Sequence, residues 1–224
     1  MADLLGMWRH SPRAWATRLP PNRLASRFLV ERTIGPDSEH RADTSTVENG
    51  RVSDDDVFVE VARRSGLTPA YRDSTGWMDA ADRPAVSVPA DGFTLADRTQ
   101  RLDVPHHMRR RSGDMVKERL EQCSLYDPAL DLVVESADGR VAGYSLYWFD
   151  PKTKVGLVEP VRVEDEFQRR GLASAMLTAG IDRLVARGAE RVKISYGSEA
   201  AAGAYQGVGF RPTSTATWYG HSPG

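Results

Sequence analysis

Residues 168 to 173 read QRRGLA, and they stand between an apolar run, Val155–Val163, and the start of an amphipathic helical pattern. A glycine at position 171 lets the backbone turn closely around an anion, and the first N–H groups of the following helix have no partner within that helix. The helix dipole adds partial positive charge there, and Arg169 and Arg170 supply forked donors that suit phosphate. The stretch therefore predicts a strand, a turn that binds pyrophosphate, and a helix.

A second pattern follows this one along the chain. The helix predicted over residues 172 to 187 is closed by Gly188, and a strand predicted over residues 191 to 196 comes next. After it, Ala201, Tyr205 and the pair Gly209-Phe210 give the order Ala-x-x-x-Tyr-x-x-x-Gly-Phe. A glycine-containing turn alone is weak evidence of a ligand, because many strand-to-helix turns use glycine. Two patterns in this order make a much stronger signal.

Together the two patterns resemble those of the GNAT superfamily of N-acetyltransferases. In that family Gln-x-x-Gly-x-Ala belongs to the loop that binds acyl-coenzyme A, and the tyrosine of the second pattern points toward the coenzyme sulfur. The resemblance implies an α/β fold of the α+β kind, with a mixed, mostly antiparallel central sheet flanked by helices and an N-terminal extension. It also implies acetyl-coenzyme A as cosubstrate, and we expect no metal.

The resemblance also assigns coenzyme contacts. In the family the strand before the loop splays from its neighbour, and Pro160 fits such a splay or bulge because proline cannot donate to a regular ladder. Ser198 stands where the family often has an asparagine that holds the pantetheine arm, and its single hydroxyl leaves that contact open. The expected coenzyme-binding residues are Val161, Arg162, Val163, Gln168, Arg169, Arg170, Gly171, Leu172, Ala173, Ser174 and Ser198.

Two residues are candidates for acid–base chemistry. Glu159 lies in an otherwise apolar strand, where partial desolvation would raise its pKa and make it a better general base. An ion pair with Arg162, or a role as a hydrogen-bond acceptor in the pocket wall, is an equal alternative. Tyr205 is the general-acid candidate, because a phenol can protonate a leaving thiolate. Its alternative is a packing aromatic.

The acceptor pocket is less clear from the sequence. Aromatic side chains with one carboxylate could clamp a cationic amine, and they could equally belong to the core. The adjacent pair His106-His107 has no further metal ligand at helical spacing, so we predict no metal site. The expected acceptor-binding residues are His107, Tyr126, Tyr147, Trp148, Asp150 and Trp218.

Composition limits the partners. The chain has 224 residues, 40% hydrophobic and 27% charged, with a net charge of -1, which argues against nucleic acid or a membrane surface as a partner. Charged runs at residues 54 to 56, 109 to 111 and 164 to 166 are interpreted as solvated turns. Cys123 is the only cysteine, so it forms no intrachain disulfide, and we interpret it as a residue without a catalytic role.

Residues 1 to 18 lack the continuous apolar core of a signal peptide, and no run approaches the roughly 20 apolar residues of a membrane span. We therefore expect a cytoplasmic protein. Arginine greatly outnumbers lysine, and alanine, glycine and valine are frequent, which suggests a GC-rich bacterial genome. A homodimer is left open.

The chain divides into two expected parts. Residues 86 to 224 hold a strand at residues 92 to 95, helices over 104 to 123 interrupted near Gly113, and apolar runs at 130 to 136 and 141 to 149 joined by Asp138-Gly139. Residues 1 to 85 are an extension or a degenerate, partial repeat of the family domain. In them a helix over 54 to 64 and a short strand near residues 76 to 78 imitate the end of the second part. An unrelated helical extension is equally expected, and residues 82 to 84 are the predicted linker.

The leading hypothesis is an enzyme that transfers an acetyl group from acetyl-coenzyme A to a primary amine of a small molecule, such as an antibiotic or metabolite. The amine would attack directly, through a tetrahedral intermediate. The alternatives are a catalytically weak coenzyme-A-binding scaffold and a protein or peptide N-acetyltransferase.

Overall fold

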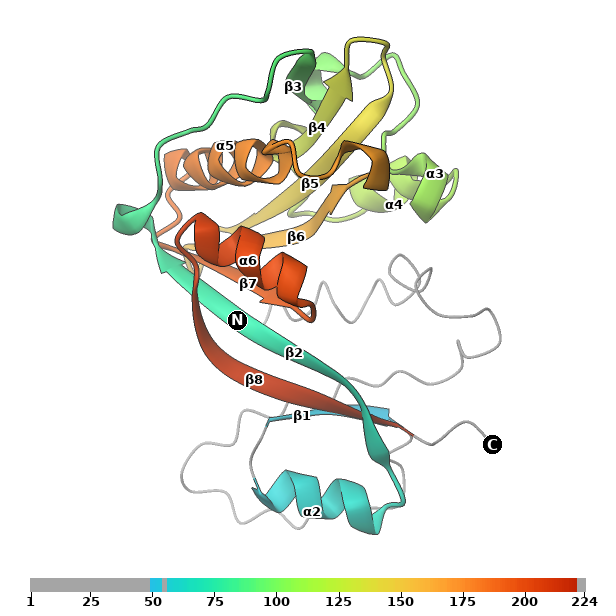
Figure 1. The fold of residues 1–224 in the computed structure, drawn as a ribbon, viewed down its shortest axis with the longest axis vertical. Coiled ribbons are helices and arrows are strands. Elements are labelled where there is room, and N and C mark those ends of the chain that lie inside the picture. The colour runs from blue at the N-terminus through green and yellow to red at the C-terminus, as the bar shows by residue number, and fades with distance from the viewer. Residues whose placement is uncertain (1–48, 54–55, 221–224) are drawn as a thin grey trace.

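The computed structural model describes residues 49–53 and 56–220. The strands within these ranges form one mixed sheet (Figure 1). Its strand order is β1-β8-β2-β7-β6-β5-β4-β3. All neighbouring strands run antiparallel except β6 and β7, which are parallel. The strands are β1 Asn49–Ser53, β2 Thr68–Asp79, β3 Phe93–Asp97, β4 Asp131–Ser136, β5 Val141–Asp150, β6 Val155–Val163, β7 Arg191–Tyr196 and β8 Arg211–Gly220. The predicted mixed, mostly antiparallel sheet is confirmed.

Helices cover both faces of this sheet. Successive residues of a strand point to opposite faces. Tyr147 of β5 packs in the cluster that includes Leu177 and Ile181 of α5, whereas Leu146 and Trp148 pack in another cluster with residues of the α3–α4 region. Helix α5 therefore lies on one face, and α3 and α4 lie on the other. The helices are α2 Asp56–Arg64, α3 Arg109–Ser112, α4 Val116–Glu121, α5 Leu172–Ala186 and α6 Glu199–Gly207.

The unit β6–α5–β7 follows the sequence prediction closely. Its apolar face is fully buried, and Gly188 reverses the chain after the helix with a φ of 99°. Packing against the sheet is tight at Gly180, where an added Cβ would lie 2.0 Å from Cζ of Tyr147. The Tyr147 hydroxyl donates a hydrogen bond to the Met176 carbonyl at 2.7 Å. Tyr147 therefore anchors α5 on the sheet and is fully buried in the core.

The hairpin predicted around Asp138-Gly139 is also present. Strands β4 and β5 pair antiparallel, and Gly139 has a φ of 79° in the turn between them. The helical region over residues 104 to 123 contains α3 and α4, with Gly113 between them at a φ of 85°. The interruption predicted at Gly113 is confirmed.

Strand β2 is longer and more central than the predicted short strand near residues 76 to 78. It spans Thr68–Asp79 and lies between β7 and β8, pairing with both (Figure 1). Its first residues, 68 to 72, are exposed, so they show no alternating apolar pattern that would reveal a strand in the sequence. Part of the predicted extension thus supplies an inner strand of the sheet. The domain boundary near residues 82 to 84 stays a prediction, and residues 1 to 48 lie outside the described ranges.

Candidate functional site

Strands β6 and β7 pair only over their first residues, and the region beyond, where the two strands are no longer paired, is called the gap below. The two strands pair from Val155↔Arg191 to Val158↔Ile194, and the pairing then stops. Strand β6 continues to Val163 along β5, while β7 ends at Tyr196, and the two strands diverge (Figure 1). The second half of β6 therefore turns one backbone edge toward the gap, and this half includes Val161 and Val163.

An irregularity in β6 coincides with the point of divergence. The register with β5 shifts between Tyr147↔Val158 and Ser145↔Val161, so Glu159 and Pro160 form a bulge. Proline has no N–H for a ladder, which explains why regular pairing fails here. The Trp148 indole Nε1–H donates to the Glu159 carbonyl at 2.9 Å and holds the bulge against β5. The irregularity predicted at Pro160 is thus present.

The gap leads to the loop that the sequence marked as an anion site. Arg169 and Gly171 have φ values of 63° and 73°, in the left-handed region, and α5 begins at Leu172. Within the described part of the chain, no protein group accepts a hydrogen bond from the N–H groups of residues 169 to 174. The first such bond runs from Ala175 to the Gly171 carbonyl at 3.0 Å. An added Cβ at Gly171 would meet no atom within 4 Å. The N-terminal, positive end of α5 therefore has N–H donors without protein partners and open space beside them.

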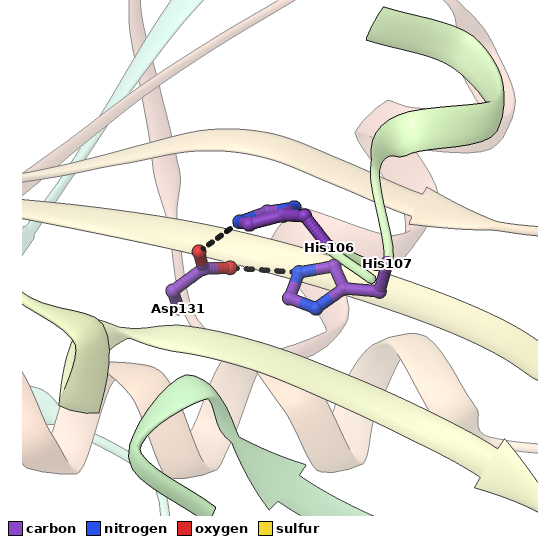
Figure 2. Close-up of side chains that lie close together, drawn as sticks. All are labelled: His106, His107 and Asp131. Atoms are coloured by element: carbon purple, nitrogen blue, oxygen red, sulfur yellow. Dashed lines mark hydrogen bonds and ion pairs between the residues drawn. The ribbon is translucent and has the colours of Figure 1, made fainter. Parts of the chain in front are cut away.

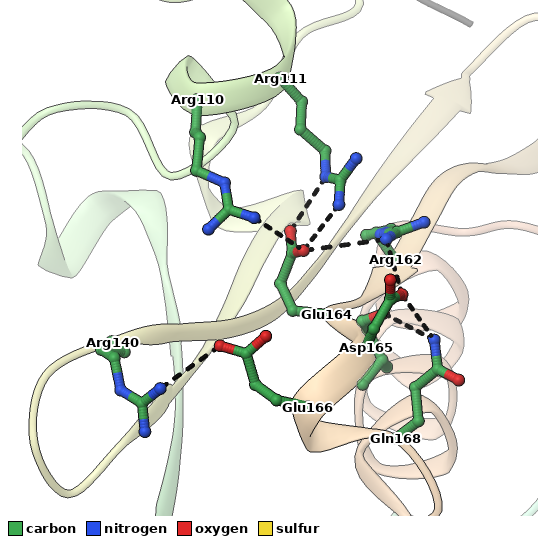
Figure 3. Close-up of polar contacts among 9 residues, drawn as sticks. Arg110, Arg111, Arg140, Arg162, Glu164, Asp165, Glu166 and Gln168 are labelled. Atoms are coloured by element: carbon green, nitrogen blue, oxygen red, sulfur yellow. Dashed lines mark hydrogen bonds and ion pairs between the residues drawn. The ribbon is translucent and has the colours of Figure 1, made fainter.

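Some side chains in and next to this loop bind other protein groups, and others are exposed to solvent. The Gln168 amide donates to Asp165 Oδ1 at 3.1 Å and to the Val163 carbonyl at 3.4 Å (Figure 3). Arg162 pairs with Asp165 at 2.9 Å. Arg169 and Arg170 are exposed, Ala173 and Ser174 are half-buried, and Leu172 is buried in the core. The backbone and the two exposed arginines are thus the groups available to an anion.

Glu164 is buried beside the loop, and arginines surround it (Figure 3). Arg111 of α3 binds its carboxylate in a fork, with distances of 3.1 and 2.7 Å, and Arg110 contacts it at 3.4 Å. The Arg111 hydrogen bonds hold the pKa of the Glu164 carboxyl below its usual range, against the opposing effect of burial. The interpretation of run 164 to 166 as a solvated turn is therefore wrong for Glu164, whereas Arg111 stays exposed although it pairs with Glu164. A contact across 53 residues leaves no local signal in the sequence.

The two acid–base candidates lie on different elements, Glu159 on β6 and Tyr205 on α6. Glu159 lies in the β6 bulge, half-buried, with its Oε2 atom buried. Tyr205 of α6 is buried, with its ring centroid 5.4 Å from that of Tyr196 and 6.3 Å from that of Phe210. Ser198 begins α6 as its N-cap, and its Oγ accepts the Ala201 N–H at 3.2 Å. The serine hydroxyl therefore has a structural partner next to the gap.

The expected acceptor-binding residues do not gather in one pocket. Tyr147 points into the core toward α5, and Trp148 points to the other face. Asp150 is buried and accepts hydrogen bonds from the Lys152 N–H at 2.9 Å and the Thr153 hydroxyl at 2.8 Å, which fixes the β5–β6 turn. Trp218 of β8 donates to Asp73 of β2 at 3.3 Å. His107 and Tyr126 lie together on the α3–α4 face, beside a residue that sequence reasoning missed.

That residue is Asp131, the first of β4, which holds both histidines (Figure 2). His106 Nε2 lies 2.9 Å from Asp131 Oδ2, and the Tyr126 hydroxyl donates to the same oxygen at 2.8 Å. His107 Nε2 lies 2.8 Å from Oδ1, a close contact between the imidazole and the carboxylate. Burial alone would raise the pKa of the Asp131 carboxyl, but the two histidines outweigh it and hold this pKa below its usual range. Burial and the Asp131 charge raise the pKa of Tyr126.

Two histidines and a carboxylate could in principle bind a metal ion, because their ligand atoms lie within 4.8 Å of one another. The Met108 N–H, however, donates to His106 Nδ1 at 3.2 Å. In a neutral imidazole the proton then sits on Nε2 and is donated to Asp131, so this nitrogen has no lone pair for a metal. The geometry favours a hydrogen-bonded network over a metal centre.

Residues 96–210 match the sequence profile described as the Acetyltransferase (GNAT) family. A mycothiol acetyltransferase of Clavibacter michiganensis subsp. michiganensis is 33% identical over 105 residues, covering 47% of this chain and 33% of that protein. A mycothiol acetyltransferase of Clavibacter sepedonicus is 31% identical, with the same coverage of 47% and 33%. The matched part spans 33% of the length of these curated relatives.

Solved structures share the fold. A GCN5-related N-acetyltransferase from Sphaerobacter thermophilus superposes with a TM-score of 0.62 at 19% identity, covering 76% of this chain and 58% of that one. A tandem GNAT protein from the clavulanic acid biosynthesis pathway gives a TM-score of 0.59 at 14% identity, covering 79% and 64%. The fold predicted from the sequence is confirmed. No helix within the described ranges has the length and apolar character to cross a membrane.

Proposed function

The chain belongs to the Acetyltransferase (GNAT) family, and on this premise we propose that it transfers the acetyl group of acetyl-coenzyme A to a primary amine of a small molecule. The observation that carries the proposal is that β6 loses its β7 partner after Val158, while the N–H groups at the start of α5 have no protein acceptor among the described residues. A pantetheine arm is narrow and carries amides, so it suits a gap edged by strand backbone. A pyrophosphate suits the start of α5.

The reaction needs donors for the oxyanion, a group that takes a proton from nitrogen and a group that protonates the thiolate. The free amine attacks the thioester carbonyl, the new C–N bond forms, and the oxygen becomes an oxyanion. We assign its stabilisation to backbone N–H groups on the open half of β6, since oriented donors at developing charge contribute strongly. The intermediate loses a proton from nitrogen, and its C–S bond then breaks. We assign to Glu159 the removal of this proton, or alternatively the holding of the amine, and we assign to Tyr205 the protonation of the departing thiolate.

A small acceptor is the class best supported. The two curated relatives are mycothiol acetyltransferases by name, and they come from bacteria. In this chain α3 is tied to the end of β6 through Arg111 and Glu164, which places a side wall next to the coenzyme path. We propose residues 86 to 224, completed by β2, as the catalytic unit.

Release of free thiol tests the function directly. We expect the purified full chain to release coenzyme A thiol from acetyl-coenzyme A when amines from a library are added, with the acetylated amine detected by mass spectrometry. The control is the same mixture without amine, which measures hydrolysis. Coenzyme binding by calorimetry, combined with no amine-dependent thiol release, would instead support a non-catalytic coenzyme-binding protein.

Replacing Glu159 by glutamine separates its two roles. If Glu159 takes the proton from the intermediate, we expect Glu159→Gln to flatten the rising limb of kcat against pH, because glutamine keeps the volume but cannot accept the proton. If Glu159 only holds the amine, the limb persists and the KM for the acceptor rises. A variant that matches the parent in both parameters across pH would place Glu159 outside the active site.

A further inference from the structure

A hollow of about 230 Å³ opens on the α3–α4 face beside the proposed coenzyme loop. His107, Arg110 and Arg111 line it from the α3 segment, Tyr144 lines it from β5, and Glu164 lines it from the end of β6. Val141 and the ion pair of Arg140 with Glu166, at 3.3 Å, complete the lining. The hydrogen-bonded pair of Arg111 and Glu164 (Figure 3) thus lines this hollow, and Glu164 stands directly before the loop of residues 165 to 174. A small molecule in the hollow would lie next to the coenzyme path, on the face opposite α5.

The two neighbouring histidines differ in what their second ring nitrogen does. In His106, Nε2 contacts Asp131 and Nδ1 accepts the Met108 N–H, so both nitrogens are used. In His107, Nε2 contacts Asp131, while Nδ1 has no hydrogen-bond partner among the described residues and is not a fully buried atom. The second ring nitrogen of His107 lies on the side of the ring away from Asp131 (Figure 2). Because His107 lines the hollow, this nitrogen is the one that can meet a ligand there.

The surroundings of His107 keep its imidazole neutral. Burial lowers its pKa below the usual value, the Asp131 contact opposes this, and the nearby His106 and Arg98 lower it further. The ring of Tyr144 lies 5.8 Å away by centroids and adds no charge in its neutral form. With Nε2 directed at Asp131, the neutral ring carries its proton on Nε2 and a lone pair on Nδ1. This is the arrangement of a proton acceptor whose partner carboxylate stabilises the imidazolium once it forms.

We propose that His107 is a catalytic base that deprotonates the incoming acceptor in this hollow. The acceptor enters as R–NH₃⁺, one N–H bond breaks, and the proton passes to Nδ1 of His107. The products are R–NH₂ and an imidazolium paired with Asp131, and the proton later leaves to water. The free amine goes on to the thioester, where Glu159 serves the second deprotonation. The inference rests on the proposed acetyl transfer, and it names the acceptor class as an amine that is protonated at neutral pH.

The test compares His107→Gln with His106→Gln. Glutamine at either position keeps an amide N–H for Asp131, but at position 107 it removes the titratable nitrogen. We expect the parent's kcat/KM to stay level at neutral pH and to fall only at pH values below the usual histidine range, because burial lowers the pKa of His107. In His107→Gln the enzyme must use the minor free-amine fraction, so kcat/KM should fall about 100-fold at pH 7 and rise with pH toward the pKa of the amine. His106→Gln should keep the dependence of kcat/KM on pH that the parent shows.

Chemical labelling of the wild-type chain supplies a readout that needs no acceptor. Diethyl pyrocarbonate modifies accessible neutral imidazoles, and fragment mass spectra separate His106 from His107. We expect His107 to be modified in the native protein and His106 only after unfolding. Labelling of neither residue, or a His107→Gln profile within threefold of the parent at every pH, would overturn the proposal. A parent that releases no thiol with any amine, yet is labelled at His107, would instead refute the proposed function on which the inference rests.

Discussion

Gly171→Asp is expected to lower the affinity for acetyl-coenzyme A by at least about 100-fold, or about 2.7 kcal/mol. Position 171 has a φ of 73° and open space around an added Cβ, so the new carboxylate has room beside the helix start. There it would meet the N–H groups that we assign to the pyrophosphate, and it would repel that anion. Calorimetry with acetyl-coenzyme A gives the change.

Gly171→Asn is the matched control for this variant. Asparagine has nearly the size of aspartate and tolerates the left-handed region, but it brings no charge. We expect it to bind coenzyme far more tightly than Gly171→Asp. Equal affinity for parent, asparagine and aspartate variants would show that the pyrophosphate binds elsewhere.

Tyr205→Phe is expected to reduce kcat by about 100- to 10,000-fold, the usual range for general acid–base assistance. The ring keeps its packing against Tyr196 and Phe210, so the thermal midpoint and the coenzyme affinity should change little. Tyr196→Phe is the control, because Tyr196 is also buried and its ring is the neighbour of Tyr205. If Tyr205→Phe lowers kcat less than about threefold, or if both variants lose the same activity, Tyr205 has a packing role alone.

The unit from β6 to β7 could be predicted because its signals are local. Gly171 takes the left-handed turn that the pattern required, and α5 ends at Ala186, one position short of the predicted helix. Strand β2 could not be predicted at its full length. Its first half is exposed, and its place in the sheet depends on β7 and β8, which come more than a hundred residues later.

In the candidate site, too, features with local sequence signals could be predicted and features set by distant residues could not. The loop and the β6 bulge could be predicted from glycine and proline, whose backbone requirements are specific. The acceptor residues could not, because aromatic identity does not say which way a side chain points. Tyr147 and Trp148 are consecutive in one strand and so face opposite sides of the sheet. Asp131 was missed because it joins His106 only across 25 residues of sequence.

Burial and pairing with Arg111 explain the error at Glu164. A run of three acidic residues is usually solvated. Here the chain turns into the protein at the end of β6, and Arg111 arrives from α3 to pair with the first of them. The pairing brings α3 against the start of the loop at residues 165 to 174, so two charged runs that looked unrelated in the sequence lie in contact (Figure 3).

A crystal structure of the full chain soaked with coenzyme A tests the central claim most directly. We predict the pantetheine arm in the gap between β7 and the second half of β6, and the pyrophosphate on the N–H groups of residues 169 to 174. The sulfur should lie nearest the bulge at Glu159-Pro160, within reach of the Tyr205 hydroxyl. Coenzyme bound in the hollow beside His107, with the β6–β7 gap left empty, would contradict the account.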